Sequence, residues 1–446
     1  MNLAAAFKSG KGSQLLAGVS FWYIVAVPSL LFLTNIGEKA YQDAFFLVLL
    51  VHALFRGRAD WSAPVLLIWS TWLAYLGWWA LTDSLGRGAI DLDPFRTGLL
   101  MLLLPWLVGW ARDENFRRPL RAGFRVALGI AAAVAVIQVF VLGAPRATGS
   151  ENALVFAALV SIYGLFIVYE ECVRGRGRGH PIVWMVVALV PVVLSGSRTV
   201  MAALLILFLL MLFRYRRSVD FRTLIVSFVG ATLFLAIFAG PQLASRVTNV
   251  VESLPTSVAE WQDFRDEFVG MDFVEPKAEE TEPSDEVSGS LKQSYKTSLG
   301  FRLVYWRTGW EVFLANPVFG VGSTQDMLEV GSVLGLGSFF HDQHSHVHNT
   351  FLQHLVTGGV PKLILLLSVL IVPLFVLKSG QAGREPILFI TAGLVMFGMT
   401  NIVLELTVVT FIYTLVIAYL LTAGQTRGRV AGGLSHERSD GSGDHS

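Results

Sequence analysis

A cluster of histidines precedes an apolar helical pattern in residues 344–359, HSHVHNTFLQHLVTGG. From Phe351 the apolar positions recur at helical spacing, and a pair of glycines ends the pattern. This arrangement predicts that His348 and Asn349 lie in the first turn of a helix. Backbone amides at that end have no partner within the helix and attract anions such as phosphate. An imidazole placed there is suited to proton chemistry beside a bound polyphosphate.

The same histidines also fit two simpler interpretations, which are a polar helix cap and an adventitious metal site. They apply equally to His341, His344, His346 and His348. The position at the predicted helix start, directly before Asn349, singles out His348. The chain contains no Walker loop and no HExxH motif, so neither a nucleotide nor a metal is expected at this site.

Three arginines in other segments have the chemistry to bind phosphate, because a guanidinium forms paired hydrogen bonds with phosphate oxygens and stays charged. Arg198 is the one basic residue of a very short hairpin, LSGSRTV, and Arg146 lies in a Gly-rich turn. Arg302 shares a predicted helix face with Trp306, four residues later. Ordinary explanations stay open, since Arg198 could extend to the lipid headgroups and Arg302 could belong to an amphipathic surface helix.

The composition indicates an integral membrane protein. Of the 446 residues 54% are hydrophobic and 15% charged, and the mean hydropathy is +0.59. The expected fold is an all-α polytopic membrane protein with about twelve transmembrane helices and one long, partly helical outer loop. The one cysteine, Cys172, cannot form an internal disulfide, so redox chemistry is not expected.

The positions of the apolar runs and of the basic residues predict the topology. The runs occupy residues 15–34, 41–55, 62–82, 95–111, 123–143, 152–169, 181–196, 199–213, 223–240, 360–377, 386–402 and 404–422. Arginine and lysine concentrate in every second connecting segment, which the positive-inside rule places in the cytoplasm. Both termini are therefore expected to be cytoplasmic, and the remaining loops to face outward.

Four regions follow from this pattern. Residues 1–240 are expected to hold nine transmembrane helices, and 350–423 the last three. Residues 241–349 form the long outer loop, which combines an acidic insert around residues 252–286 with an aromatic, helical second half. The role of the acidic insert stays open. Residues 424–446 are expected to be a disordered cytoplasmic tail.

Three segments of the chain resemble the O-antigen ligase superfamily of bacterial inner-membrane glycan transferases. They are SGSRTV around Arg198, the R-x-x-x-W and NP-x-x-G-x-G block from Arg302 to Gly322, and the H-N pair with a glycine ten residues after the asparagine, at Gly359. Their order and the expected topology also resemble the family. One departure is Lys362, which occupies the place of the second glycine of the family's G-x-x-G.

This resemblance implies a donor glycan on undecaprenyl diphosphate and a sugar hydroxyl as acceptor, on lipid A core in a ligase or on a growing glycan in a polymerase. It implies that Arg198 and Arg302 bind the diphosphate and that His348 acts at the acceptor, at the periplasmic face and without cofactor or metal. Arg146, Asn349 and Trp306 are further candidates for substrate binding. No nucleic-acid partner is expected, and the bilayer is the protein's surroundings.

Two alternatives to a ligase stay open. A polymerase uses the same donor, and the sequence does not separate the two. A transporter of lipid-linked glycans would place ionisable groups near the bilayer midplane, between two halves with paired broken helices. Here the candidate residues lie at the predicted outer face, which favours an enzyme. Whether His348 is a general base or orients the acceptor also stays open.

Overall fold

The computed structural model describes residues 59–149, 152–174, 180–216, 298–334, 346–377, 383–403 and 405–422, with isolated positions near 26 and 225–230. Every regular element in these ranges is helical, as the sequence predicts. The expected spans at 15–34 and 41–55, most of the span at 223–240, the acidic insert and the tail at 424–446 lie outside the described residues.

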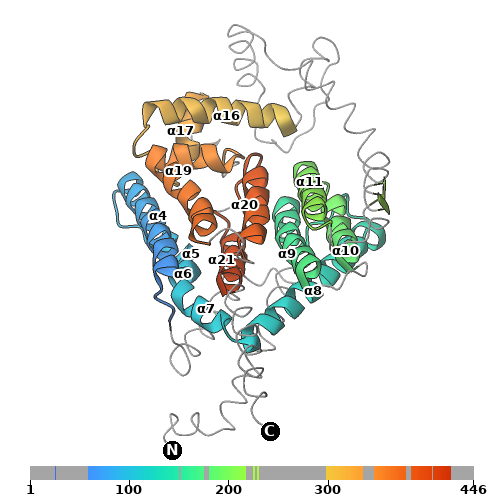
Figure 1. Ribbon diagram of the computed structural model, residues 1–446. Coiled ribbons are helices and arrows are strands. Elements are labelled where there is room, and N and C mark those ends of the chain that lie inside the picture. Colours follow the sequence, from blue (N-terminus) through green and yellow to red (C-terminus); the bar gives the residue numbers. More distant parts are fainter. Residues whose placement is uncertain are drawn as a thin grey trace, which may run out of the picture.

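The described helices form one bundle with two helices across one end (Figure 1). In chain order they are α4 (Ala63–Arg87), α5 (Asp93–Thr97), α6 (Leu99–Leu102), α7 (Leu104–Ala111), α8 (Glu114–Val136), the π-helix η1 (Ile137–Val141), α9 (Ala153–Arg174), α10 (His180–Leu194), α11 (Arg198–Arg214), α16 (Ser298–Ala315), α17 (Asp326–Val333), α19 (Thr350–Val376), α20 (Arg384–Gly398) and α21 (Thr407–Thr422). α4 packs on α19, α20 packs on α9 and α11, and α16 lies across the start of α19.

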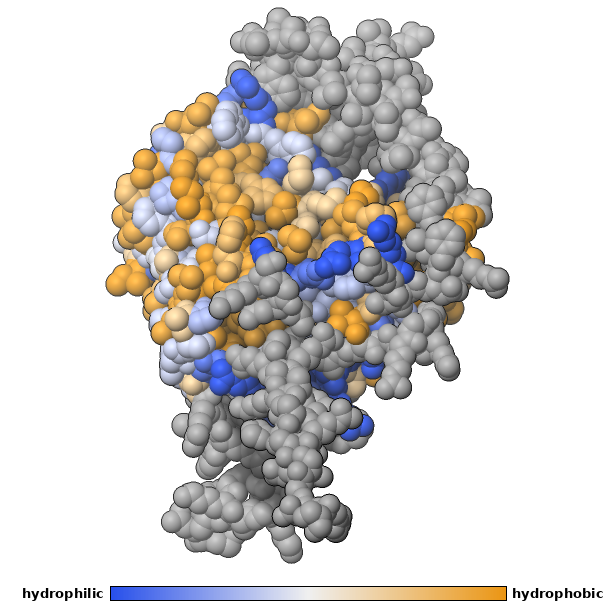
Figure 2. Space-filling model, in the orientation of Figure 1, coloured by the Kyte–Doolittle hydropathy of each residue, from blue (hydrophilic) through white to orange (hydrophobic). Residues whose placement is uncertain are grey.

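Four helical stretches of the described chain are long and apolar enough to cross a membrane, namely α4, 116–141, 153–173 and α19. Two shorter apolar helices are Pro181–Leu194 and Thr407–Thr422. Figure 2 shows apolar residues over much of the described surface, as is typical of a surface that faces lipid. The apolar helices indicate an integral membrane protein, and the count of twelve spans stays a prediction.

The expected run at 95–111 is not one helix. It is divided into α5, α6 and α7, with breaks at Gly98 and Leu103. Gly98 packs so closely on Leu76 of α4 that a Cβ there would collide with the leucine methyls. Pro105, at the start of α7, has no N–H to donate to a preceding turn. Hydropathy alone does not register either break.

Contacts between helix ends fix which termini share an end of the bundle. Arg214, at the end of α11, forms an ion pair with Glu385, at the start of α20. Further along, a Cβ on Gly393 of α20 would lie 3.3 Å from Leu207 of α11, so the two helices run antiparallel. The start of α11 therefore lies beside the end of α20. We call this end of the bundle, where α11 begins and α20 finishes, the site end.

Candidate functional site

The start of α19 lies at the site end, held by a capping asparagine. Asn349 Oδ1 accepts hydrogen bonds from the backbone amides of Phe351 and Leu352 at 3.0 and 3.1 Å, and its Nδ2 donates to the Met399 carbonyl at 3.1 Å. Such a cap satisfies amides that have no partner within the helix. α19 therefore begins at Thr350, and His348 lies just outside the first turn, not within it as expected. The side chain of Asn349 serves the helix cap.

His348 has an unusual backbone conformation and two aromatic neighbours. Its φ is 56°, which makes it the one non-glycine residue in the described chain with a positive φ. The left-handed conformation costs such a residue about 1 kcal/mol or more and is often found at functional sites. Its ring stacks on Tyr305 with centroids 5.8 Å apart and packs edge-on against His346 at 4.3 Å.

One face of α16 is turned toward the His348 segment. Arg302, Tyr305, Trp306 and Gly309 share that face by helical spacing. Besides the stacking of Tyr305 on His348, a Cβ on Gly309 would lie 3.3 Å from the side chain of Val347. The sequence prediction that Arg302 and Trp306 share a face holds, and the structure turns this face toward the histidine.

The two predicted residues on this face are half-buried, which matters for their chemistry. Burial lowers the pKa of the Arg302 guanidinium from its ordinary value, so its positive charge is only partly screened by water. The Trp306 indole N–H is buried and has no hydrogen-bond partner among the described residues. By contrast, Arg307 points away from this face, is 53% exposed and forms an ion pair with Glu311 at 3.0 Å.

Arg198 and Arg146 lie on two adjoining segments at the site end. Arg198 is the first residue of α11 and is half-buried, whereas Arg146 is exposed. The Ala147 amide donates to the Leu194 carbonyl at 2.8 Å, and this bond joins the two segments. Gln138 holds the Arg146 turn further, by accepting from the amides of residues 148 and 149 and donating to the carbonyl of residue 149.

The structure thus groups the predicted residues in two pairs at one end of the bundle. Arg302 and His348 are joined through Tyr305, and Arg146 and Arg198 through their segments. Gly398, at the end of α20, packs on Thr350 with its Cβ position 3.3 Å from Oγ1, which connects the start of α19 to the end of α20, the helix that runs antiparallel to α11. The candidate phosphate-binding arginines and the candidate histidine therefore lie at the same end of the bundle.

The glycines of the two loop motifs meet in one backbone contact. Gly359 has φ 67° and interrupts α19, which resumes directly after it, so the expected helix stop is a break within a longer helix. The loop 316–322 lies in this break. Val321 N–H donates to the Val356 carbonyl at 2.9 Å, Gly322 N–H to that of residue 357 at 3.0 Å, and Val360 N–H to that of residue 317 at 2.9 Å.

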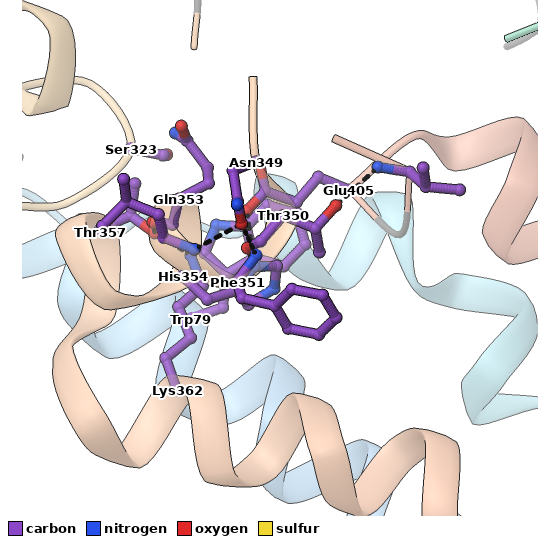
Figure 3. A network of polar contacts seen from close by, with 12 residues as sticks. Trp79, Ser323, Asn349, Thr350, Phe351, Gln353, His354, Thr357, Lys362 and Glu405 are labelled. Atoms are coloured by element: carbon purple, nitrogen blue, oxygen red, sulfur yellow. Dashed lines mark hydrogen bonds and ion pairs between the residues drawn. The ribbon is translucent and has the colours of Figure 1, made fainter. Parts of the chain in front are cut away.

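A buried ionic cluster near this break was not predicted as part of a site. The Lys362 side chain is 0% exposed, its Nζ donates to Thr357 Oγ1 at 2.8 Å, and it lies 4.7 Å from the Trp79 ring centre. The carboxylates of Asp83, Asp326 and Glu405 act on its charge. Figure 3 shows that Lys362 extends from the second half of α19 toward Thr357 in the first half.

The sequence signal for this cluster was an ionisable residue within an apolar run, which in a membrane protein is a functional candidate by default. Lys362 was noted only as a departure from a family motif. Beside it, His354 is also fully buried, with Nε2 2.8 Å from the Tyr75 hydroxyl and Nδ1 3.3 Å from Glu405 Oε1. Among the residues that the structure describes, no three His, Cys, Asp or Glu side chains form a group that would hold a metal ion.

Comparison with known families gives one match, to the family described as O-Antigen ligase, over residues 183–367. The matched segment contains Arg198, Arg302 and His348, and Arg146 precedes it. The match confirms the resemblance that the three sequence motifs indicated. A search of curated proteins found no match.

Proposed function

We propose, from the O-antigen ligase match and the grouping of Arg198, Arg302 and His348 at one end of the bundle, that this protein is a membrane glycan transferase. Its donor is a glycan on undecaprenyl diphosphate, and its acceptor is a sugar hydroxyl of lipid A core. The alternative within the family is a polymerase, which adds the same donor glycan to a growing chain.

The observation that carries this proposal is the contact between His348 and the Arg302 face of α16. Tyr305 stacks on the imidazole, and Arg302 precedes Tyr305 by one helical turn on the same face. A phosphate-binding side chain and a proton-transfer side chain, far apart in sequence, are thus presented to one region. Such convergence of charged and titratable groups is typical of an active site.

The chemistry requires both kinds of group. When the bond between the anomeric carbon and the diphosphate oxygen breaks, negative charge grows on the leaving diphosphate, and fixed guanidinium groups stabilise that charge. The acceptor hydroxyl attacks the anomeric carbon and releases its proton, which His348 accepts or directs. General-base catalysis of this kind typically contributes about 10² to 10⁴ in rate. Direct attack inverts the anomeric configuration.

The side of the membrane on which the site lies is part of the same proposal. The distribution of basic residues puts the site end on the outward face, so the reaction takes place at the periplasmic side of a bacterial inner membrane. The arginines, which stay charged at any working pH, supply the positive charge that the leaving diphosphate needs.

Reconstitution of the purified protein in liposomes tests the proposal. The donor is an undecaprenyl-diphosphate glycan, and the two acceptors, lipid A core and free glycan, are offered separately. We expect glycan on lipid A core and release of undecaprenyl diphosphate. His348→Ala should reduce turnover by about 100-fold or more while donor binding persists. The control is His346→Ala, which removes the ring that packs against His348 and leaves the His348 imidazole in place.

Each other outcome has a distinct meaning. Extension of the free glycan alone would assign the polymerase reaction. Loss of donor binding in His348→Ala would remove the histidine from the chemistry, because an imidazole that acts at the acceptor leaves the diphosphate contacts in place. A folded wild-type protein that makes neither product would contradict the proposed function.

A further inference from the structure

The side chain of Gln353 connects the His348 segment to α17. Val347 N–H, one residue before His348, donates to Gln353 Oε1 at 3.0 Å, and Gln353 Nε2 donates to Asp326 Oδ2. All three residues are buried, with Gln353 and Asp326 each 2% exposed and Val347 0%. Figure 3 places Gln353 on the first half of α19, ahead of the break. We call Val347, Gln353 and Asp326 the amide chain.

The donors and acceptors allow one orientation of this chain. A backbone N–H donates only, and an ionised carboxylate accepts only, so the glutamine must present its oxygen to Val347 and its nitrogen to Asp326. The second carboxylate oxygen of Asp326 accepts from the Met327 amide at 2.7 Å. Asp326 is thereby fixed at the first turn of α17, and the chain joins two helices.

The backbone that the amide chain holds is the one that bears the left-handed His348. The chain fixes it on one side, at Val347. On the other side, the Thr350 amide and hydroxyl donate to the Asn401 carbonyl at 3.1 and 2.8 Å. Because a positive φ persists only where surrounding contacts determine it, both anchors are needed to keep the imidazole in place.

The charge on Asp326 is balanced within the buried cluster. Burial raises the pKa of Asp326 to about 6, whereas its hydrogen bonds and the Lys362 ammonium oppose this rise. Loss of the carboxylate would therefore remove a hydrogen-bond acceptor and one of the negative charges that face Lys362. An exchange that moves the carboxylate from position 326 to position 353 would keep one carboxylate and one amide in the chain.

We propose that Gln353 and Asp326 are positioning residues, which hold His348 in its transfer geometry through the Val347 amide. The inference rests on the proposed function, in which His348 acts at the acceptor. Both side chains are buried away from the surface, so their substitution should lower turnover and leave the KM for the donor nearly unchanged.

An exchange of the two side chains tests this chain directly. In Gln353→Glu two carboxylates face each other, and in Asp326→Asn the new amide cannot accept from both Gln353 and Met327. We expect each single variant to lose about 10- to 100-fold in kcat, as for small misplacements of a catalytic group. In the double variant the carboxylate introduced at position 353 accepts from the Val347 amide and from the side-chain amide introduced at position 326. Activity should then return to near the wild-type rate.

The matched control is the double variant Gln325→Glu with Glu329→Gln. It makes the same kind of exchange between carboxylate and amide, at the N-cap and in the first turn of α17, outside the amide chain. Glu329 is exposed, and Gln325 makes no side-chain cap bond. This variant should keep the wild-type rate. A double variant at positions 326 and 353 that is no better than the worse single variant, or that does not fold, would overturn the inference.

Hydrogen exchange at the Val347 amide gives a readout that does not depend on activity. Both single variants should speed its exchange, and the double variant should restore the slow rate. If the wild-type protein makes no product but this exchange pattern holds, the proposed function fails and the amide chain stands. If the wild-type protein is active and Val347 exchange is the same in every variant, the amide chain fails.

Discussion

Arg302 illustrates how one side chain combines charge with partial burial. Its guanidinium lies on the α16 face that contacts the His348 segment, and burial lowers its pKa from the ordinary value. An arginine stays protonated despite such a shift. Because water screens it less, its attraction for a phosphate is stronger than that of an exposed arginine.

Substitutions at Arg198 and Arg302 test whether this charge binds the diphosphate. Alanine at either position should lower kcat/KM by about 10² to 10³, the range for loss of one group that stabilises transition-state charge. Lysine should recover little, because it cannot form the paired hydrogen bonds of a guanidinium. Arg307→Ala, exposed on the same helix as Arg302, is the control and should keep wild-type activity. Full activity in both alanine variants would contradict the assignment.

At the residue scale, sequence reasoning located side chains whose local signals are strong. The H-N pair before an apolar helical pattern predicted that His348 lies at a helix start, and the structure has it two residues before Thr350, the first residue of α19. The cluster of Lys362 with its partners was not predicted from the sequence. Its carboxylates, Asp83, Asp326 and Glu405, come from α4, α17 and the segment before α21. No local spacing encodes such a cluster, and only the packed helices bring it together.

At the element scale, the break in α19 determines how the loop 316–322 is held. Three backbone hydrogen bonds connect the two segments, and the glycines allow their main chains to approach closely. A Cβ on Gly359 would collide with the Val318 carbonyl, and one on Gly320 with the backbone at Gly358. Both Gly359 and Gly320 have a positive φ, which L-residues with a side chain rarely adopt.

Gly359→Ala should therefore lower both stability and activity. The left-handed conformation alone costs about 1 to 2 kcal/mol for a non-glycine residue, and the collision with Val318 adds to it. Gly77→Ala is the matched control, because a Cβ on Gly77 of α4 meets nothing within 4 Å and alanine is the better helix former. Thermal unfolding in detergent should show a lower Tm for the first variant alone. Equal Tm values would show that the α19 break tolerates a side chain.

Element positions were predicted well where a single apolar run makes a single helix, as for α4, α9 and α11. The ends of the helices were predicted less well where contacts with other segments break an apolar run. The run at 95–111 is divided by Gly98 and Leu103, and the run at 360–377 is the second half of a helix that starts at Thr350. In both cases a neighbouring segment packs against a glycine, which hydropathy does not detect.

At the scale of the whole molecule, the antiparallel helices place the described parts of the predicted outer loops at one end. α11 and α19 both begin there, and α16 lies across it (Figure 1). Arg198, Arg302 and His348 therefore share a compartment if the bundle crosses the membrane as the basic residues predict. The number of crossings in the full chain and the side that each loop faces stay predictions.

Cysteine labelling tests this orientation. The one native cysteine, Cys172, is buried, so the wild-type protein should give little background with a membrane-impermeant maleimide. In intact spheroplasts, Arg146→Cys at the site end should be labelled, whereas Arg118→Cys, on the predicted cytoplasmic side, should react only after lysis. Both positions are exposed, so they differ in side rather than in access. The reverse pattern would place the candidate site in the cytoplasm.

The joint between α19 and the loop 316–322 is made of main-chain atoms, and several side chains beside it point outward. Val318 is 52% exposed and Val360 41%. Because the joint is made by main-chain atoms, substitutions at these outward positions should leave the register of the two segments unchanged. The side chains at these positions can therefore vary, whereas Gly320 and Gly359 beside them have no room for a side chain.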